Sequence, residues 1–267
     1  MDRDFLAFRA LTFSRFCPIR HFDSRMEQYT KRSYRKRVRS AGLVTFGVAV
    51  KETDLQVSAE KRLEKETRDL IFDARNQIEN YISAHPEFLT TLKPYPADPY
   101  APSLVREMIQ CTKEVGVGPM ASVAGAVAQH VGKGLLGITP QVIVENGGDL
   151  FMKVNRPVTV AVFAARSPLS EKLGIIVSPE SMPLGVCSSS GTVGHSYSTG
   201  IADAACVLAS SAAFADGAAT ALCNRIQSQK DLSRIGAWAE KTKGVLGVLV
   251  VLGGKMASWG SIELVAL

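Results

Sequence analysis

The order of apolar patterns along the chain limits its fold more than any other feature. Short strand-like runs occur in pairs, and amphipathic helical patterns separate one pair from the next. A parallel, doubly wound sheet would instead need single strands that alternate regularly with helices. We therefore expect an α+β fold with antiparallel sheets and helices on one face. Because the pattern of strand pair and long helix occurs twice, we also expect two similar halves.

The expected elements follow from periodicity and from turn residues. Residues 43–59 are typical of two strands joined by a turn near residues 52–54, and a proline-rich connector covers residues 87–102. The first long helix presents an apolar stripe and ends before Pro86. The stripe consists of Leu63, Thr67, Leu70, Ala74, Ile78 and Tyr81. Further helices are expected over residues 103–115, 119–136, 213–226 and 233–243, and further strands over 142–144, 150–154, 158–164, 174–177, 205–208, 245–252 and 262–267.

Charge is concentrated at the N-terminus. The chain has 267 residues and a formal net charge of +6, but residues 1–40 hold eleven Lys or Arg residues against four acidic ones. The remainder is nearly neutral, and this distribution argues against a nucleic-acid partner. Met26 follows the basic leader and precedes the first strand-like run. We expect residues 1–25 to lie outside the fold and residues 26–267 to form one domain.

The cysteines and the apolar runs bear on compartment and partners. The five cysteines are widely spaced and form no CxxC or Cys/His cluster, so neither a zinc site nor a disulfide framework is indicated. Free thiols fit a reducing, cytoplasmic environment. The longest apolar run, residues 244–254, is too short to span a bilayer. We expect a cytoplasmic protein with no membrane partner, and homo-oligomerisation stays open.

Residues 185–200, GVCSSSGTVGHSYSTG, interrupt the apolar chain with hydroxyls and glycines. Such a stretch predicts a long surface loop or a surface that holds a polar ligand, and phosphate fits it best. Cys187 and His195 are the candidates for a reactive Cys–His couple. No GxSxG nucleophile elbow is present.

Two glycine-containing segments have both a structural and a functional interpretation. Residues 116–125, GVGPMASVAG, follow a helical pattern, whereas a dinucleotide-binding site needs a strand before its glycines. This segment predicts a tight helix–helix turn or an anion site at a helix N-terminus that includes Gly118. Residues 144–154, VENGGDLFMKV, predict a hairpin turn. Glu145 and Asp149 beside that turn would bind a metal or a ribose hydroxyl, or face water.

Asp216 and Thr220 are four residues apart in a helical pattern and therefore share a face. Asp216 can be the N-cap of its helix. Alternatively, both side chains supply oxygen ligands to Mg²⁺. The spacing alone favours the cap.

Taken together and in order, four segments closely resemble an uncharacterised family related to the ApbE-type flavin transferases, which are FAD:protein FMN transferases. The segments are VGVGPMASVAGAVAQHVG, VENGGDLF, CSSSGTVGHSYSTGIAD and ADGAATALCN. The resemblance runs from about Ser33 to the C-terminus. It implies a T-fold, ApbE-like architecture with two similar halves and a nucleotide site between them.

The resemblance also implies roles for single residues. Asp216 and Thr220 match the Mg²⁺-binding "AD-x-x-AT" of the transferases, which favours the metal interpretation. Gly147-Gly148-Asp149 matches their "GGD" turn, and Ser190-Gly191 matches their Ser-Gly turn. Two departures argue against strict FAD:protein FMN transfer: residues 121–131 lack the Lys and Asp of "KGYAVD", and GHSYSTG lacks the Asp-Pro of "H-I-x-D-P-x-T-G".

We therefore expect an ApbE-related protein that binds a nucleotide or another phosphorylated ligand with Mg²⁺, with FAD as one candidate and a transferase as one implied activity. A first alternative is sulfur incorporation during homocysteine formation in anaerobes, an activity with which the related family has been associated. In that case Cys187 would carry the sulfur as a thiolate of lowered pKa, and a sulfur-metabolism protein would be a partner. A second is a non-catalytic flavin or nucleotide carrier. The expected catalytic residues are Cys187 and His195, and the expected metal ligands are Asp216 and Thr220. The expected ligand-binding residues are Gly118, Asn146, Gly147, Gly148, Asp149, Ser188, Ser189, Ser190, Gly191, Thr192, Ser196 and Thr199.

Overall fold

An antiparallel sheet of eight strands forms the centre of the protein. The computed structural model describes residues 42–192 and 198–267. In spatial order the strands are β1 (Val44–Val50), β2 (Thr53–Ala59), β3 (Val142–Asn146), β4 (Asp149–Lys153), β7 (Leu184–Ser189), β8 (Ala204–Ala209), β9 (Val245–Leu252) and β10 (Lys255–Gly260). Every neighbouring pair is antiparallel, and the spatial order follows the chain order.

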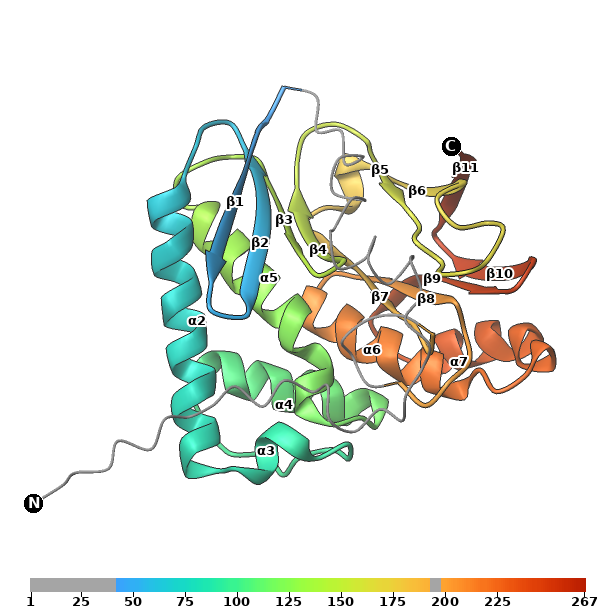
Figure 1. Ribbon diagram of the computed structural model, residues 1–267, viewed down its shortest axis with the longest axis horizontal. Coiled ribbons are helices and arrows are strands. Elements are labelled where there is room, and N and C mark those ends of the chain that lie inside the picture. The colour runs from blue at the N-terminus through green and yellow to red at the C-terminus, as the bar shows by residue number, and fades with distance from the viewer. Residues whose placement is uncertain (1–41, 193–197) are drawn as a thin grey trace, which may run out of the picture. The chain divides into compact units, whose positions relative to one another are not determined.

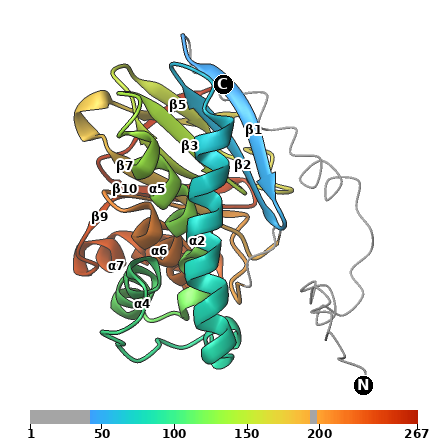
Figure 2. The same cartoon turned by 90° about the vertical axis from the view of Figure 1, so that its left-hand side faces the viewer.

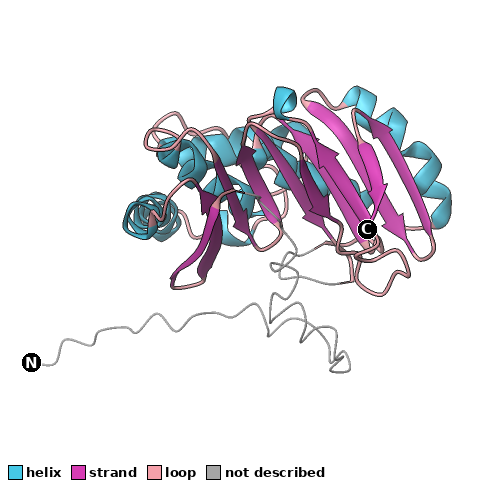
Figure 3. Ribbon diagram, turned by 90° about the horizontal axis from the view of Figure 1, so that it is seen from above, coloured by secondary structure: helices cyan, strands magenta, loops and turns pink. Residues whose placement is uncertain are grey.

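Helices cover one face of this sheet (Figures 1 and 3). They are α2 (Glu64–Ala84), the short α3 (Glu87–Thr90), α4 (Ser103–Val115), α5 (Val123–Leu135), α6 (Ala212–Arg225) and α7 (Ile235–Lys241), with 3₁₀ turns at Pro119–Ser122, Pro179–Ser181 and Gln229–Arg234. Two strands, a group of helices and two strands follow one another from β1 to β4, and the same order recurs from β7 to β10. The predicted α+β architecture with helices on one face is confirmed. No described helix is long and apolar enough to cross a membrane.

A second, smaller sheet covers part of the other face. It consists of β11 (Glu263–Ala266), β6 (Leu173–Val177) and β5 (Val158–Ala161), in that order. Alternate residues of the large sheet therefore enter two different apolar cores. Phe151 and Val248 pack against the helices, whereas Met152 and Leu249 pack toward the small sheet. Figure 2 shows α2 and α5 beside the large sheet from the edge of β1.

Several predicted elements need correction. The predicted apolar stripe of α2 is buried at every position except Leu70, which is half-buried, and Ile71 next to it is buried as well. The proline-rich connector contains α3, and strand β10 was missed because its sequence, KMASWG, shows no regular alternation of apolar and polar residues. The N-terminal boundary at residue 25 lies outside the described residues.

The expectation that residues 185–200 form a loop is wrong for its first part. Residues 185–189 belong to β7, in the middle of the large sheet, and are paired with both β4 and β8. Cys187 and Ser189 on this strand are buried. Small side chains are needed here because α6 lies directly against β7.

Three small residues let α6 approach both β7 and α5. A Cβ on Gly185 would lie 2.3 Å from Cα of Ala212 at the start of α6. A Cβ on Gly125 of α5 would lie 2.2 Å from the carbonyl oxygen of the same Ala212. Backbone atoms cannot move aside as a flexible side chain can, so this column of Gly185, Ala212 and Gly125 fixes the distance between the three elements.

We predict that Gly185→Ala lowers the free energy of unfolding by about 1–3 kcal/mol, because the added methyl overpacks the contact with Ala212. Urea denaturation followed by circular dichroism measures the change. Gly47→Ala on β1 is the matched control, since its Cβ would have no neighbour closer than 3.8 Å. The control should be neutral or slightly stabilising. Equal destabilisation by both substitutions would contradict the overpacking explanation.

Candidate functional site

The candidate site lies where the β3–β4 turn, the strand β7 and the N-terminal halves of α5 and α6 come together (Figure 1). Most of the polar residues predicted from the sequence come from these four elements. The site therefore joins segments that are far apart in the chain.

The β3–β4 connection is a two-residue hairpin turn. Asn146 pairs with Asp149 across the turn, and Gly147 and Gly148 have φ angles of +66° and +106°. Positive φ at both central positions is what a type I′ turn requires, so glycine suits both. Glu145 Oε1 accepts a hydrogen bond from the Gly148 amide at 2.8 Å, and Asn146 Nδ2 donates to the Ala124 carbonyl at 3.1 Å. The turn is thereby attached to the start of α5.

Neither carboxylate beside the turn faces water, which corrects one of the three interpretations offered for them. Glu145 is 4% exposed and Asp149 is 5% exposed. Asp149 Oδ1 accepts a hydrogen bond from the Ser188 amide of β7 at 3.1 Å. Burial, with a smaller contribution from the neighbouring Glu145, raises the pKa of Asp149 to about 7, although the Ser188 amide opposes this shift.

Asp216 does not cap its own helix, and that interpretation is wrong. Helix α6 begins at Ala212, and its N-cap is Ser211, whose hydroxyl accepts from the Phe214 amide. Asp216 lies in the second turn, where its Oδ2 accepts a hydrogen bond from the Gly125 amide of α5 at 2.9 Å. Helix α5 has no side-chain cap of its own. Asp216 therefore satisfies a free N-terminal amide of a different helix, where the helix dipole also favours a negative charge.

The bond between Asp216 and the Gly125 amide also bears on the anion site that was predicted for residues 116–125. The anion at the N-terminus of α5 is the protein's own carboxylate rather than a ligand. Gly118 packs against the end of α3, because a Cβ on it would lie 1.9 Å from the Thr91 carbonyl oxygen. The structure does not bring Gly118 to the Asp149–Asp216 region through any described hydrogen bond.

The buried charges in the described part of the chain are all negative. The buried charged side chains are Glu145, Asp149, Asp203 and Asp216, and no Lys, Arg or His is among them. Burial and the nearby charge of Asp149 raise the pKa of Asp216 well above its usual range. For Asp149 and Asp216, burial of this kind favours either protonation of the carboxyl group or binding of a cation.

Two buried hydroxyls, one on α6 and one on the facing strand β7, lack a well-formed hydrogen bond. Thr220 Oγ1 lies one helical turn after Asp216, and Ser189 Oγ lies on β7; each residue is 4% exposed. Thr220 Oγ1 has no hydrogen-bond partner among the described residues, and Ser189 Oγ has none of good geometry, its polar neighbour being the Cys223 thiol. An unpaired buried hydroxyl costs about 1–3 kcal/mol. A carboxylate and a free hydroxyl on one helix face are donors that fit Mg²⁺, although the described residues contain no cluster of three His, Cys, Asp or Glu side chains that would hold a metal.

The surroundings of Cys187 contradict the prediction of a lowered pKa. Its side chain is completely buried, and the thiol donates to the Ala212 carbonyl at 3.3 Å. Burial, followed by the charges of Asp149 and Asp216, raises the pKa of Cys187 well above the value of a free thiol. A protonated, enclosed thiol is a poor nucleophile and a poor sulfur carrier.

The Ser/Gly-rich segment is tied down at both of its described ends. Ser190 Oγ lies 3.1 Å from Thr192 Oγ1, and the Thr192 hydroxyl lies 3.4 Å from Asp203 Oδ1. At the other end, the Thr199 amide and hydroxyl donate to Asn224 Oδ1 at 2.8 and 3.1 Å. Gly191 and Gly200 lie against protein backbone, so the close approach that their size permits is to the chain itself. His195 and Ser196 lie outside the described residues.

Two residues of this region were missed from the sequence. Asn224 accepts three hydrogen bonds from Ser198 and Thr199, and Asp203 accepts one from the Gly253 amide at 2.7 Å. Asp203 is the last residue of the segment CSSSGTVGHSYSTGIAD, and Asn224 is the last residue of ADGAATALCN. Both segments carry the family resemblance. No spacing rule distinguishes such residues from ordinary surface polar residues, because their partners are distant in the sequence.

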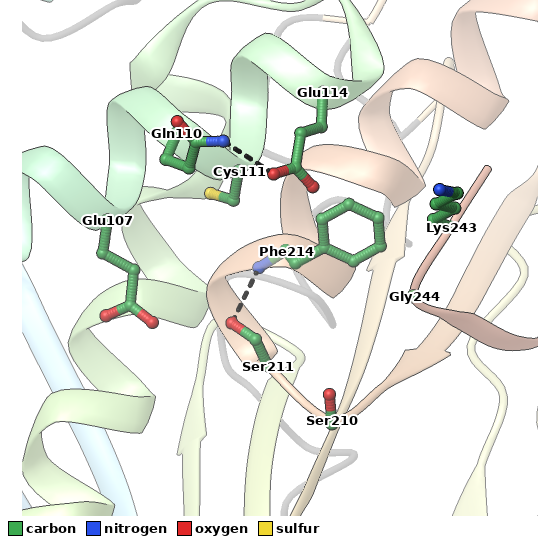
Figure 4. A pocket seen from close by; sticks show the side chains of 9 residues that line it. All are labelled: Glu107, Gln110, Cys111, Glu114, Ser210, Ser211, Phe214, Lys243 and Gly244. Atoms are coloured by element: carbon green, nitrogen blue, oxygen red, sulfur yellow. Dashed lines mark hydrogen bonds between the residues drawn. The ribbon is translucent and has the colours of Figure 1, made fainter. Parts of the chain in front are cut away.

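A separate cavity of about 300 Å³ lies between α4, the start of α6 and residues 243–244 (Figure 4). Glu107 and Glu114 of α4 line one wall, and Lys243 lies across from them. Gln110 bonds to Glu114, and Ser211 bonds to the Phe214 amide. None of the residues predicted from the sequence lines this cavity.

Solved structures define the class to which this fold belongs. It matches the apo form of the flavinyl transferase ApbE from Pseudomonas stutzeri, with a TM-score of 0.55, 15% identity, and coverage of 81% of this chain and 94% of that protein. It also matches the flavin transferase ApbE from Vibrio cholerae, with a TM-score of 0.54, 12% identity, and coverage of 84% and 96%. The chain therefore has the ApbE fold.

Sequence comparison gives the particular family. A profile of the family described as "AbpE bacteria" matches residues 35–254. The UPF0280 protein of Methanosphaerula palustris is 38% identical over 218 residues, which cover 79% of this chain and 89% of that protein. The UPF0280 protein of Methanocella arvoryzae is 36% identical over 214 residues, with coverage of 80% and 87%. The chain belongs to this uncharacterised, ApbE-related family, as the resemblance predicted.

The pKa of Asp149 predicts a pH dependence of stability. Between the value of 3.8 expected in the unfolded chain and the value of about 7 in the folded protein, unfolding releases the proton of this carboxyl. The free energy of unfolding should therefore fall as pH rises from 4 to 7, by about 4 kcal/mol from this group, and then stay level.

Urea denaturation of the wild type and Asp149→Asn, in the presence of a metal chelator, tests this prediction. The amide keeps an acceptor for Ser188 and cannot ionise, so the variant should gain stability relative to the wild type as pH rises to 7. Parallel stability curves for the two proteins would contradict a raised pKa for Asp149.

Proposed function

We propose that this protein binds a nucleotide or another phosphorylated ligand together with Mg²⁺ at the site formed by the β3–β4 turn, β7 and α6. FAD is the ligand to test first, because the solved structures of this fold include flavin transferases. The main support is the pair of buried carboxyl groups Asp149 and Asp216, whose pKa values are raised by burial, beside the buried Thr220 hydroxyl, which lacks a hydrogen-bond partner among the described residues.

The chain's own residues divide the binding task. Asp216 and Thr220, which are four residues apart on one helix face, would hold the ion. Ser190 and Thr192 add hydroxyls near the end of β7, and the exposed Ser188 lies beside the Gly148 backbone on the strand face opposite to Ser189. Hydroxyls and glycine backbone are suited to the oxygens of a phosphate group. When bound, Mg²⁺ would neutralise part of the phosphate charge.

We propose ligand binding for this chain, and not FMN transfer. The first turns of α5 carry Ala, Ser, Val and Gly where the transferases have a Lys and an Asp, and the α5 amides are already engaged by Asp216. The chain thus offers fewer charged groups for cleavage of a pyrophosphate. A non-catalytic flavin or nucleotide carrier remains the second candidate on this observation. The sulfur-transfer alternative receives no support from the enclosed, protonated Cys187 thiol.

We predict that FAD, ADP or FMN binds the full chain at least tenfold more tightly with Mg²⁺ than with a chelator, as measured by flavin fluorescence or by calorimetry for ADP. Asp216→Asn and Thr220→Val should remove this Mg²⁺ dependence. Thr112→Val is the matched control, because Thr112 is also a buried helical threonine but donates to the Met108 carbonyl.

The three ligands separate the parts of the proposal. Binding of FAD and ADP but not FMN would place recognition on the adenosine diphosphate half, and binding without product formation would favour the carrier. If none of the three binds in the presence of Mg²⁺, the proposed function is wrong.

A further inference from the structure

Helix α6 and strand β7 present a shared polar strip inside the helix-covered core. Cys187 and Ser189 are two residues apart on the strand and therefore point to the same face. Cys187 reaches the start of α6 through its bond to Ala212, and Ser189 lies near Cys223 at the other end of the helix. Asp216 and Thr220 occupy the helix between these two contacts. Ser189 is thus placed opposite the part of α6 that contains Thr220.

The unpaired hydroxyls are concentrated in this strip. Eight serines and threonines are buried in the described chain, and five of them have hydrogen-bond partners. The three without partners are Thr67, Ser189 and Thr220. Thr67 lies on α2, whereas Ser189 and Thr220 lie on two elements that pack directly against each other. Thr220 lies one turn after Asp216 and Ser189 lies on the strand that faces this part of α6, so one bound partner can reach both hydroxyl oxygens.

We propose that the Ser189 hydroxyl is an oxygen ligand of the divalent cation, together with Asp216 and Thr220. This inference rests on the proposed function, because it places the ion between α6 and β7. One carboxylate and two neutral hydroxyls leave further positions of a hard cation for water or phosphate oxygens. The other side of the strip has no buried Lys or Arg in the described residues that would oppose the ion.

The test is the binding of Mn²⁺ alone, measured by electron paramagnetic resonance on the full chain without any nucleotide. Ser189→Ala should weaken Mn²⁺ binding by about tenfold, and Asp216→Asn should weaken it more. Ser58→Ala is the matched control, since Ser58 is an equally buried strand serine whose hydroxyl lies 2.8 Å from Thr45 Oγ1. The control should bind Mn²⁺ like the wild type.

In a Cys223→Ala background, which removes the thiol beside Ser189, Ser189→Cys gives a readout that a merely structural serine would not change. A thiol is close in size to the hydroxyl but is a softer ligand, so this variant should bind Mn²⁺ more weakly and Cd²⁺ more tightly than the wild type. Ser58→Cys, measured under the same reducing conditions, should show neither change. The cysteine variant also covers the case in which Ser189→Ala fails to fold.

The outcomes distinguish this inference from the proposed function. If Asp216→Asn loses Mn²⁺ but both Ser189 variants keep wild-type affinities for Mn²⁺ and Cd²⁺, the role of Ser189 is wrong and the metal site stands. A Ser189 effect that appears only when a nucleotide is present would assign the hydroxyl to the ligand and overturn its role as a metal ligand. If Asp216→Asn leaves Mn²⁺ binding unchanged, both the metal site and the inference are wrong.

Discussion

The contact between the Asp216 carboxylate and the Gly125 amide holds the two central helices of the protein in register. Helix α5 begins without a side-chain cap, and α6 supplies the missing acceptor from its second turn. A hydrogen bond to a carboxylate at a helix N-terminus combines amide satisfaction with a favourable dipole interaction. Because Asn146 also binds the Ala124 carbonyl, the hairpin turn, α5 and α6 meet at a single point. This junction positions Asp216 and the hairpin turn next to Asp149.

Packing and charge oppose each other at this junction. The close approach of β7, α6 and α5 excludes water, and exclusion of water raises the pKa values of Asp149 and Asp216. The same approach leaves the Thr220 and Ser189 hydroxyls without partners among the described residues. A fold that only needed stability would place apolar side chains at such positions. The cost in stability is therefore most easily explained by a ligand that the buried oxygens recognise, which is the basis of the proposed function.

The sequence predicted the architecture well because strand and helix periodicities are local properties. The boundaries of α4 and β9 agree with the predicted ranges, and the two glycines of the GGD turn occupy a two-residue hairpin. The errors arise where a distant partner decides the local structure. Residues 185–189 looked like a loop because their small side chains fit only against α6, and Asp216 looked like the cap of its own helix because its true partner, Gly125, is far away in the chain. The raised pKa of Cys187 and the bonds of Asn224 depend on tertiary contacts in the same way.

The column of Gly185, Ala212 and Gly125 has a consequence for how this protein can change. The shortest contacts at Gly185 and Gly125 are to backbone atoms of Ala212, so a smaller neighbouring side chain would not relieve the overlap caused by a larger residue at either position. These three positions should therefore behave as one unit under random mutagenesis, and libraries selected for folded protein should retain the three small residues together. The nearby Ser188 and Thr192 have exposed hydroxyls and should vary freely in the same libraries. They should be retained only when ligand binding is selected as well. Comparing the two selections would separate, position by position, what folding requires from what recognition requires.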